Sequence, residues 1–252
     1  MLISMDALDK EQRRPNLGCF TILVLLVQGL GLTAVILVAV WMGHFREGFA
    51  WQSKPSLEFN YHPVFMVIGL VFLYADAILA YRVFRNVKKI YIKVIHAVIH
   101  VGALMFAAVG LKAVFDSHNL ATKQIPNLYS LHSWLGLATV ILFGLQWLGG
   151  FLTYLFPGMN TGMRRMMMPF HVFFGMMIFL MAVGSALTGI MEKATFLSAP
   201  IEYSSLPPEG ILLNCLGLCL VALAAVVIYI MTRSDYKRQP SPDEEHIQLV
   251  GD

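Results

Sequence analysis

Apolar residues occur along this chain in long uninterrupted runs, and short polar segments with turn-forming residues separate them. Each run is close to the roughly 20 residues that a helix needs to cross about 30 Å of hydrocarbon. A membrane barrel would instead show strands with alternating polarity, and these runs do not alternate. The pattern predicts an all-α membrane protein with six transmembrane helices, at residues 17 to about 42, 62 to about 84, about 91 to 115, 131–156, 169–191 and 211–231.

Composition supports a chain that is solvated mainly by lipid. Hydrophobic residues make up 58% of the sequence and charged residues 13%, whereas soluble domains carry about 25% charged residues. The charged first residues and the long run after them argue against a cleavable signal peptide. We expect a cytoplasmic segment over 1–16, a transmembrane domain over 17–232 and a disordered cytoplasmic tail over 233–252. The lipid bilayer is the expected surrounding, and no nucleic-acid partner is expected.

Lysine and arginine gather on one side of the predicted helices. With the N-terminus inside, 13 of the 18 basic residues fall in inner segments and five in outer ones. Cytoplasmic loops carry such an excess of positive charge. We therefore expect both termini to be cytoplasmic.

Four of the eight histidines lie near the starts of consecutive predicted helices. His62 and His132 begin the second and fourth helices at the outer side. His96 and His171 begin the third and fifth helices at the inner side. The chain thus places one histidine pair near each membrane face.

Paired intramembrane histidines suit haem ligation. Ionisable groups within a membrane are costly and usually mark function, and two helices of a bundle can supply both axial ligands of a haem iron. A bis-histidine iron leaves no open position for substrate, which favours electron transfer. A zinc or copper site is less natural because no third ligand is evident near the outer pair. Spacing alone leaves His96 and His100 as alternatives, since they lie four apart on one helical face.

Seven motifs distributed over most of the chain carry a resemblance to a known family: FNYHPVFMVIGLVF at 59–72, YRVFRN at 81–86, KVIHA at 93–97, AVFDSHN at 113–119, NLYSLHSWLG at 127–136, MPFH at 168–171 and PPEG at 207–210. Together they resemble the cytochrome b561 family of ascorbate-dependent transmembrane oxidoreductases. The animal branch that includes the secretory-granule protein is matched by YRVFRN and AVFD.

The resemblance implies that the second to fifth helices form a four-helix bundle around two haem b groups. It implies an outer haem on His62 and His132 and an inner haem on His96 and His171, and it selects His96 over His100. It also implies a homodimer.

A basic cluster beside the inner histidines is a candidate donor site. Lysine and arginine can hydrogen-bond the oxygens of an ascorbate monoanion. The same charges could simply set topology. The resemblance favours substrate binding by Arg82, Lys89, Lys93 and Arg164, and we place Lys93 first, as a catalytic residue.

A second group of residues is expected near the outer haem. The resemblance implies substrate contacts from Phe115, His118, Asn119 and Tyr129. His118 is also a catalytic candidate, since a histidine near neutral pH can exchange the proton that accompanies ascorbate chemistry. Lys112 departs from the apolar residue expected there.

The function implied is electron transfer from cytosolic ascorbate through two b haems to monodehydroascorbate on the lumenal side, in a secretory-vesicle membrane. An alternative is an ascorbate-dependent ferric reductase of a plasma or endolysosomal membrane, with a ferric chelate as acceptor. A haem-free transporter or scaffold would have no need for paired intramembrane histidines. The haem subunit of a quinone-linked dehydrogenase would lack the YSLHSW motif.

Overall fold

A computed structural model describes residues 16–197 and 203–239 of the chain. Within these residues the protein is helical and contains no strand. Six helical stretches are long and apolar enough to cross a membrane: Phe20–Phe45, Pro55–Val83, Lys89–Asn119, Leu131–Tyr154, Thr161–Phe196 and Pro208–Thr232. The predicted all-helical membrane fold is therefore confirmed.

The first two stretches are composite, and the other four are single helices. The first comprises α2 (Phe20–Val40) and a π-helical turn, η1 (Trp41–Phe45). The second comprises α3 (Pro55–Glu58), α4 (Tyr61–Met66), the π-helical η2 (Val67–Leu73) and α5 (Tyr74–Val83). The remaining helices are α6 (Lys89–Asn119), α7 (Leu131–Tyr154), α8 (Thr161–Leu197) and α10 (Pro208–Thr232), followed by a 3-10 turn, η3 (Ser234–Tyr236).

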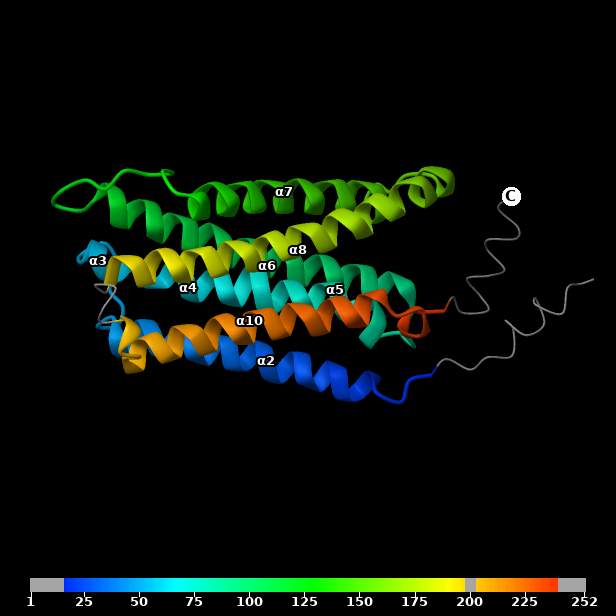
Figure 1. The fold of residues 1–252 in the computed structure, drawn as a ribbon. Helices are drawn as coiled ribbons and strands as arrows, with labels where there is room; N and C mark the ends of the chain where they lie inside the picture. The colour runs from blue at the N-terminus through cyan, green and yellow to red at the C-terminus, as the bar shows by residue number, and fades with distance from the viewer. Residues whose placement is uncertain (1–15, 198–202, 240–252) are drawn as a thin grey trace, which may run out of the picture.

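The helices run roughly parallel in one elongated bundle (Figure 1). Helices α2 and α10 lie side by side along one edge, and α7 lies along the opposite edge. The first and last described residues lie at the same end, together with the α5–α6 and α7–α8 connections. We call this end the basic end, because it carries Arg82, Lys89, Lys93, Arg164 and Lys237. The other end is called the outer end.

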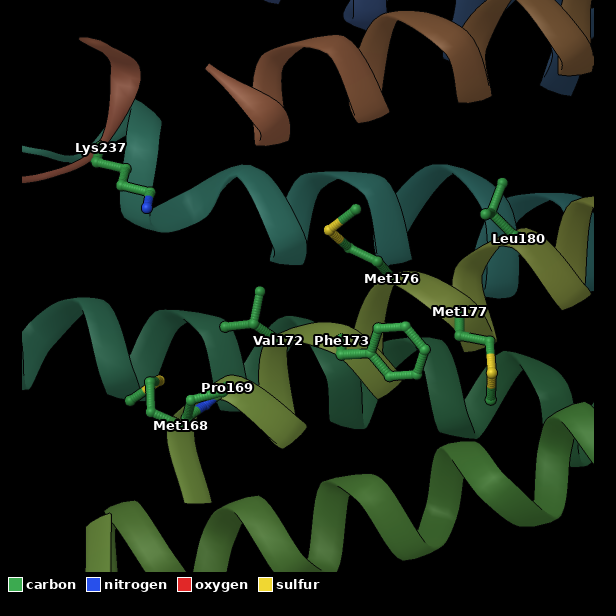
Figure 2. Close-up of a pocket in the computed structure, with 8 residues that line it drawn as sticks. All are labelled: Met168, Pro169, Val172, Phe173, Met176, Met177, Leu180 and Lys237. Carbon is green, nitrogen blue, oxygen red and sulfur yellow. The ribbon is translucent and has the colours of Figure 1, made fainter. Parts of the chain in front are cut away.

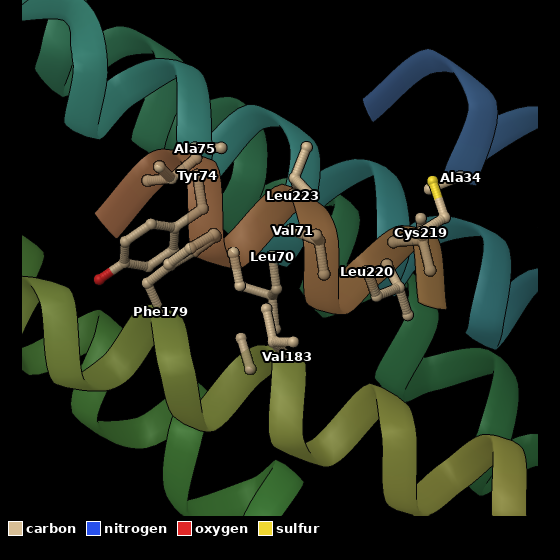
Figure 3. Close-up of a cluster of buried hydrophobic side chains, with 14 of the residues drawn as sticks. Ala34, Leu70, Val71, Tyr74, Ala75, Phe179, Val183, Cys219, Leu220 and Leu223 are labelled. Carbon is tan, nitrogen blue, oxygen red and sulfur yellow. The ribbon is translucent and has the colours of Figure 1, made fainter. Parts of the chain in front are cut away.

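The buried core ties the second stretch to α2, α8 and α10. Its side chains come from all four elements, as Figure 3 shows for Ala34, Leu70, Val71, Tyr74, Phe179, Val183, Leu220 and Leu223. The second stretch also packs closely on α6 at Gly69, where a Cβ atom would lie 2.8 Å from the Ala103 carbonyl oxygen. Glycine allows this approach because it has no side chain. The helices that carry His62 and His96 are therefore held firmly together.

Helix α8 is longer at both ends than the predicted span of 169–191. It begins at Thr161, eight residues earlier, so His171 lies about three turns inside the helix instead of at its start. Two features of the sequence explain why the predicted helix starts too late. Arg164 and Arg165 can stay helical at a membrane boundary while their charged ends reach water. Pro169 stands within the helix, which membrane helices tolerate.

The predicted disordered tail is ordered where it begins. Residues Ser234–Tyr236 form η3, and the Tyr236 ring is buried against Phe20 with 5.1 Å between ring centroids. Arg238 donates a hydrogen bond to the Val87 carbonyl. The prediction of disorder from residue 233 is therefore wrong for 233–239. The expected disorder of 240–252 and nearly all of the N-terminal segment lie outside the described residues.

Candidate haem and substrate sites

Two pairs of histidine rings face each other inside the bundle. Toward the outer end, His62 of α4 and His132 of α7 have ring centroids 6.1 Å apart. Toward the basic end, the rings of His96 on α6 and His171 on α8 are 6.2 Å apart. The structure thus brings together the two pairs that the sequence grouped by membrane face.

The ring separations fit axial ligation of one iron by each pair. Metal–nitrogen bonds of about 2.0 Å, plus about 1.1 Å from each nitrogen to its ring centre, give a centroid separation of about 6.2 Å. In the part of the chain that the structure describes, no three histidine, cysteine, aspartate or glutamate side chains gather as they would around a bare metal ion. Two ligands from opposite sides match the need of a haem iron.

Hydrogen bonds to the rings also favour ligation through Nε2. The Nδ1 atom of His62 lies 3.0 Å from the Gly110 carbonyl oxygen, that of His96 2.7 Å from Ala77, and that of His132 2.8 Å from Ser185. A carbonyl only accepts, so each Nδ1 donates its proton and each Nε2 keeps a lone pair. Metal-binding histidines commonly use this arrangement.

His171 has a different neighbour, which the sequence did not reveal. Its Nδ1 lies 3.1 Å from the amide Nε2 of Gln146 on α7, and the same amide nitrogen donates to the His171 carbonyl over 2.7 Å. The Gln146 amide therefore contacts the ring of this histidine and donates to its backbone carbonyl. A glutamine within an apolar run was the one available signal of such a role.

Two glycines leave the room that the histidine rings occupy. A Cβ atom at Gly150 would lie 2.9 Å from Cε1 of His171, and one at Gly189 would lie 2.7 Å from Cε1 of His132. Real Cβ atoms essentially never come this close to another atom. One ring of each pair is thus cradled by a glycine on the neighbouring helix, and neither glycine was predicted as a site residue.

His100 occupies a position between aromatic side chains instead of opposite a ligand. Its ring centroid is 4.8 Å from Tyr74, 5.3 Å from Phe143 and 4.5 Å from His96. The side chain is buried. His96, and not His100, forms the 6.2 Å pair with His171, which agrees with the choice that the resemblance implied.

A polar cluster lies beside the inner histidine pair. Lys93 donates from Nζ to the Tyr154 carbonyl oxygen over 2.8 Å, and the Tyr154 ring lies 5.2 Å from that of His171. The Tyr154 hydroxyl and Nε of Arg164 are buried without a hydrogen-bond partner in the described residues. Such groups are costly when unpaired, so they are suited to receive a polar ligand. Lys89 lies one helical turn before Lys93; Tyr154 was not predicted.

Arg82 has a different environment from the other predicted donor-site residues. Its side chain is 6% exposed, and it donates to the carbonyl oxygens of Met231 (2.6 Å) and Arg233 (2.7 Å). These carbonyls end α10, where backbone acceptors lack helical partners. The contacts do not support the predicted substrate role, because the guanidinium clamps the end of α10 instead.

We therefore expect Arg82→Gln to lower stability and leave substrate affinity unchanged. Hydrogen bonds from a charged group each contribute about 1.5–3 kcal/mol, so the thermal unfolding midpoint in detergent should fall clearly. Lys88→Gln removes an exposed charge at the same end and is the control. An unchanged midpoint with a raised KM for ascorbate would instead restore Arg82 to the donor site.

The predicted outer residues lie at the end of α6 and in the loop before α7. His118 Nδ1 is 3.0 Å from Oδ1 of Asn127, and Nδ2 of Asn127 donates to Oδ1 of Asn119 over 2.9 Å. Phe115 is partly exposed on α6, and Tyr129 is 57% exposed just before α7. Hydrogen bonds through Asn127 thus join His118 and Asn119 into one exposed group.

Lys112 is neutralised locally. Its Nζ lies 2.5 Å from the Asp116 carboxylate, one helical turn away on α6. Lys112, the residue that departs from the family pattern, therefore forms an ion pair with Asp116 at the surface of the outer end.

His132 owes its position to a well-defined start of α7. Ser130 caps the helix: its hydroxyl accepts from the Ser133 amide, while the Ser133 hydroxyl accepts from the Ser130 amide. Ser130 also donates to Glu192 of α8 over 2.9 Å. The cap fixes the first turn of α7, and the bond to Glu192 joins that turn to α8.

Comparison with known proteins agrees with this site. Residues 61–197 match the family described as eukaryotic cytochrome b561. The "Transmembrane ascorbate-dependent reductase CYB561" of Sus scrofa is 48% identical, and the match covers 94% of this chain and 92% of the relative. The protein of the same name from Homo sapiens is 47% identical, and the match covers 88% of this chain and 86% of the relative. The "Plasma membrane ascorbate-dependent reductase CYBRD1" of Xenopus tropicalis is 41% identical over 92% and 82%. Because the family match covers more than half of the chain, and these relatives cover most of it, the protein belongs to the eukaryotic cytochrome b561 family.

Proposed function

We propose that this protein is a transmembrane reductase that takes electrons from ascorbate on one side of a bilayer and delivers them to monodehydroascorbate on the other. Relatives with 47–48% identity are named ascorbate-dependent reductases. The observation that carries the proposal is the pair of histidine rings near each end of a membrane-spanning bundle. Two haem b groups held by His62 with His132 and by His96 with His171 would supply one-electron chemistry.

The polar cluster beside the inner pair suits the donor. Lys93 brings a positive charge and Tyr154 and Arg164 bring buried hydrogen-bonding atoms to the side of His171. An ascorbate monoanion offers negative charge and several oxygens to such groups. Each ascorbate monoanion that loses one electron and one proton becomes the monodehydroascorbate radical anion, and the proton leaves to water at the basic end.

The outer end suits the acceptor. Monodehydroascorbate gains one electron and one proton to regenerate ascorbate, so a proton donor is needed there. His118 lies at the end of α6 and is oriented by Asn127. A histidine is suited to this task near neutral pH. A ferric chelate, the alternative acceptor, would need the electron only.

The same proposal includes the cellular arrangement. Both described chain ends lie at the basic end, and an excess of lysine and arginine marks cytoplasmic segments. We infer that the termini are cytoplasmic, that the protein resides in a secretory-vesicle membrane, and that it forms a homodimer.

Reconstituted vesicles test this function. Vesicles would enclose either monodehydroascorbate, generated inside by ascorbate oxidase, or a ferric chelate, and receive ascorbate outside. We expect the internal radical to disappear faster with the protein than with the His132→Ala variant or in protein-free vesicles. If external ascorbate reduced the haem of the protein but the enclosed acceptor was not consumed, that result would contradict transmembrane transfer. Faster loss of the ferric chelate than of the radical would favour the alternative.

Lys93→Gln should weaken ascorbate binding. Loss of one charge-assisted hydrogen bond of about 1.5–3 kcal/mol should raise the KM for ascorbate about tenfold or more. Stopped-flow measurement of haem reduction would show the effect with ascorbate but not with dithionite, which needs no specific site. Lys88→Gln, with the same charge change at the same end, should behave as the unaltered protein. Equal KM values for the two variants would remove Lys93 from the donor site.

A further inference from the structure

An apolar groove of about 590 Å³ lies on the surface of α8 toward the basic end (Figure 2). Helix α8 forms its walls over more than three turns, and one side chain from the segment after α10 completes it. The lining residues are Met168, Pro169, Val172, Phe173, Met176, Met177, Leu180 and Lys237.

The groove is separate from the inner histidine pair. At about 100° per residue, Met176 and Leu180 point about 140° and 180° around α8 from His171. His171 faces His96 inside the bundle, so the groove lies on the opposite, membrane-facing side of the helix. Val172 is 43% exposed there. Neither the haem ligands nor the cluster around Lys93 belongs to this groove.

Its polarity is graded along its length. Lys237 lies toward the end formed by Met168 and Pro169, while Leu180 lies at the other end (Figure 2). The Lys237 side chain is exposed, and its backbone is held in place because neighbouring Tyr236 packs on Phe20. The groove therefore has one cationic end and is apolar elsewhere.

The groove has the length of one lipid chain in one leaflet. Met168 and Leu180 are 12 residues apart, which corresponds to about 18 Å along a helix. Half of a hydrocarbon core of about 30 Å is about 15 Å. The cationic end lies at the basic end of the bundle, the end at which membrane-spanning helices α8 and α10 meet one face of the bilayer.

We propose that this groove binds an anionic phospholipid from the leaflet at the basic end, with one acyl chain along α8 and the phosphate beside Lys237. The ammonium group of lysine is a compact charge that suits a phosphate. Basic residues next to membrane helices attract anionic lipids of the cytoplasmic leaflet. Arg238 follows Lys237 in the sequence, whereas Arg233 is paired with Asp235 over 3.6 Å. A zwitterionic lipid would fill the same groove but would gain less from Lys237.

Native mass spectrometry of the purified holoprotein, incubated with equal amounts of phosphatidylserine and phosphatidylcholine of identical chains, tests the site. We expect preferential retention of phosphatidylserine. Lys237→Gln should reduce that preference several-fold, and the matched charge variant Lys88→Gln should keep it. Val172→Trp should fill the groove and reduce retention of both lipids, whereas Val40→Trp, at a similarly exposed position on α2 (42%), should not.

Three results would overturn the proposal. One is equal retention of the two lipids by the unaltered protein. Another is an equal loss of preference in Lys237→Gln and Lys88→Gln, which would indicate only general attraction to the basic end. The third is conversion of a dimer to a monomer by Val172→Trp with lipid retention unchanged, which would make the groove an interface between copies. The haem spectrum of every variant reports whether the bundle has formed.

Discussion

Replacing His96 by alanine will leave the protein with about half of its haem and without ascorbate-driven electron transfer across a membrane. The ring of His96 faces that of His171 at 6.2 Å, a separation that fits one shared iron. Without one of its two proposed axial ligands the proposed inner haem should be lost or bound weakly, whereas the outer pair is on different helices and stays intact. With the two haems proposed above, haem per protein, measured as the pyridine complex, should fall from two to about one.

His100→Ala is the matched control for this experiment. His100 lies on the same face of α6 one turn further along, with its ring centroid only 4.5 Å from that of His96. It packs between Tyr74 and Phe143 instead of opposite a ligand, so this variant should retain both haems. If His100→Ala lost a haem and His96→Ala did not, the assignment of the inner ligand would be wrong.

Adding a single methyl group at Gly150 will disturb the inner haem, while the same change at Gly149 will not. A Cβ atom at Gly150 would lie 2.9 Å from the His171 ring, and one at Gly149 would meet nothing within 4 Å. Alanine is otherwise favoured over glycine in a helix by about 1 kcal/mol, so Gly149→Ala should fold at least as well as the unaltered protein. Gly150→Ala must push His171 out of line with His96.

The measurements for this pair are haem content, the electron paramagnetic resonance signal of each haem and the redox titration of each. We expect a lost or altered inner haem in Gly150→Ala and two normal haems in Gly149→Ala. Gly189→Ala, whose Cβ atom would lie 2.7 Å from His132, should affect the outer haem instead. Identical signals from Gly149→Ala and Gly150→Ala would show that the His171 ring has room to move.

The histidine pairing could be predicted because it depends on two strong regularities of the chain. Long apolar runs force the backbone to cross the membrane as helices, and successive crossings alternate in direction. A histidine near the start of the apolar run in each of four consecutive crossings therefore falls alternately on the two faces. The geometry of His62 with His132 and of His96 with His171 agrees with this reasoning.

Features that depend on contact between helices could not be predicted in this way. Gly150 and Gly189 matter only because a particular histidine packs against each of them. The amide of Gln146 acquires a role only when α7 and α8 are adjacent. For Arg82 the resemblance favours substrate binding, but the end of α10 lies within reach and takes up its hydrogen bonds.

The start of α8 was misplaced for a different reason. Charged residues and a proline usually mark the end of a membrane helix, and Arg164, Arg165 and Pro169 occur together there. In the structure the helix continues through all three. The polarity of the tail after α10 predicts disorder, but Tyr236 anchors the start of this tail on Phe20.

The order of the four histidines along the chain has a consequence for biosynthesis. The pairs interleave, because His96 lies between the members of the outer pair and His132 between those of the inner pair. A ribosome therefore completes the outer pair once α7 has been made, and the inner pair only after α8 has emerged. We expect the outer haem to be the first that a nascent chain can retain. Helix α10 carries none of these histidines, so both haems could be acquired before synthesis ends.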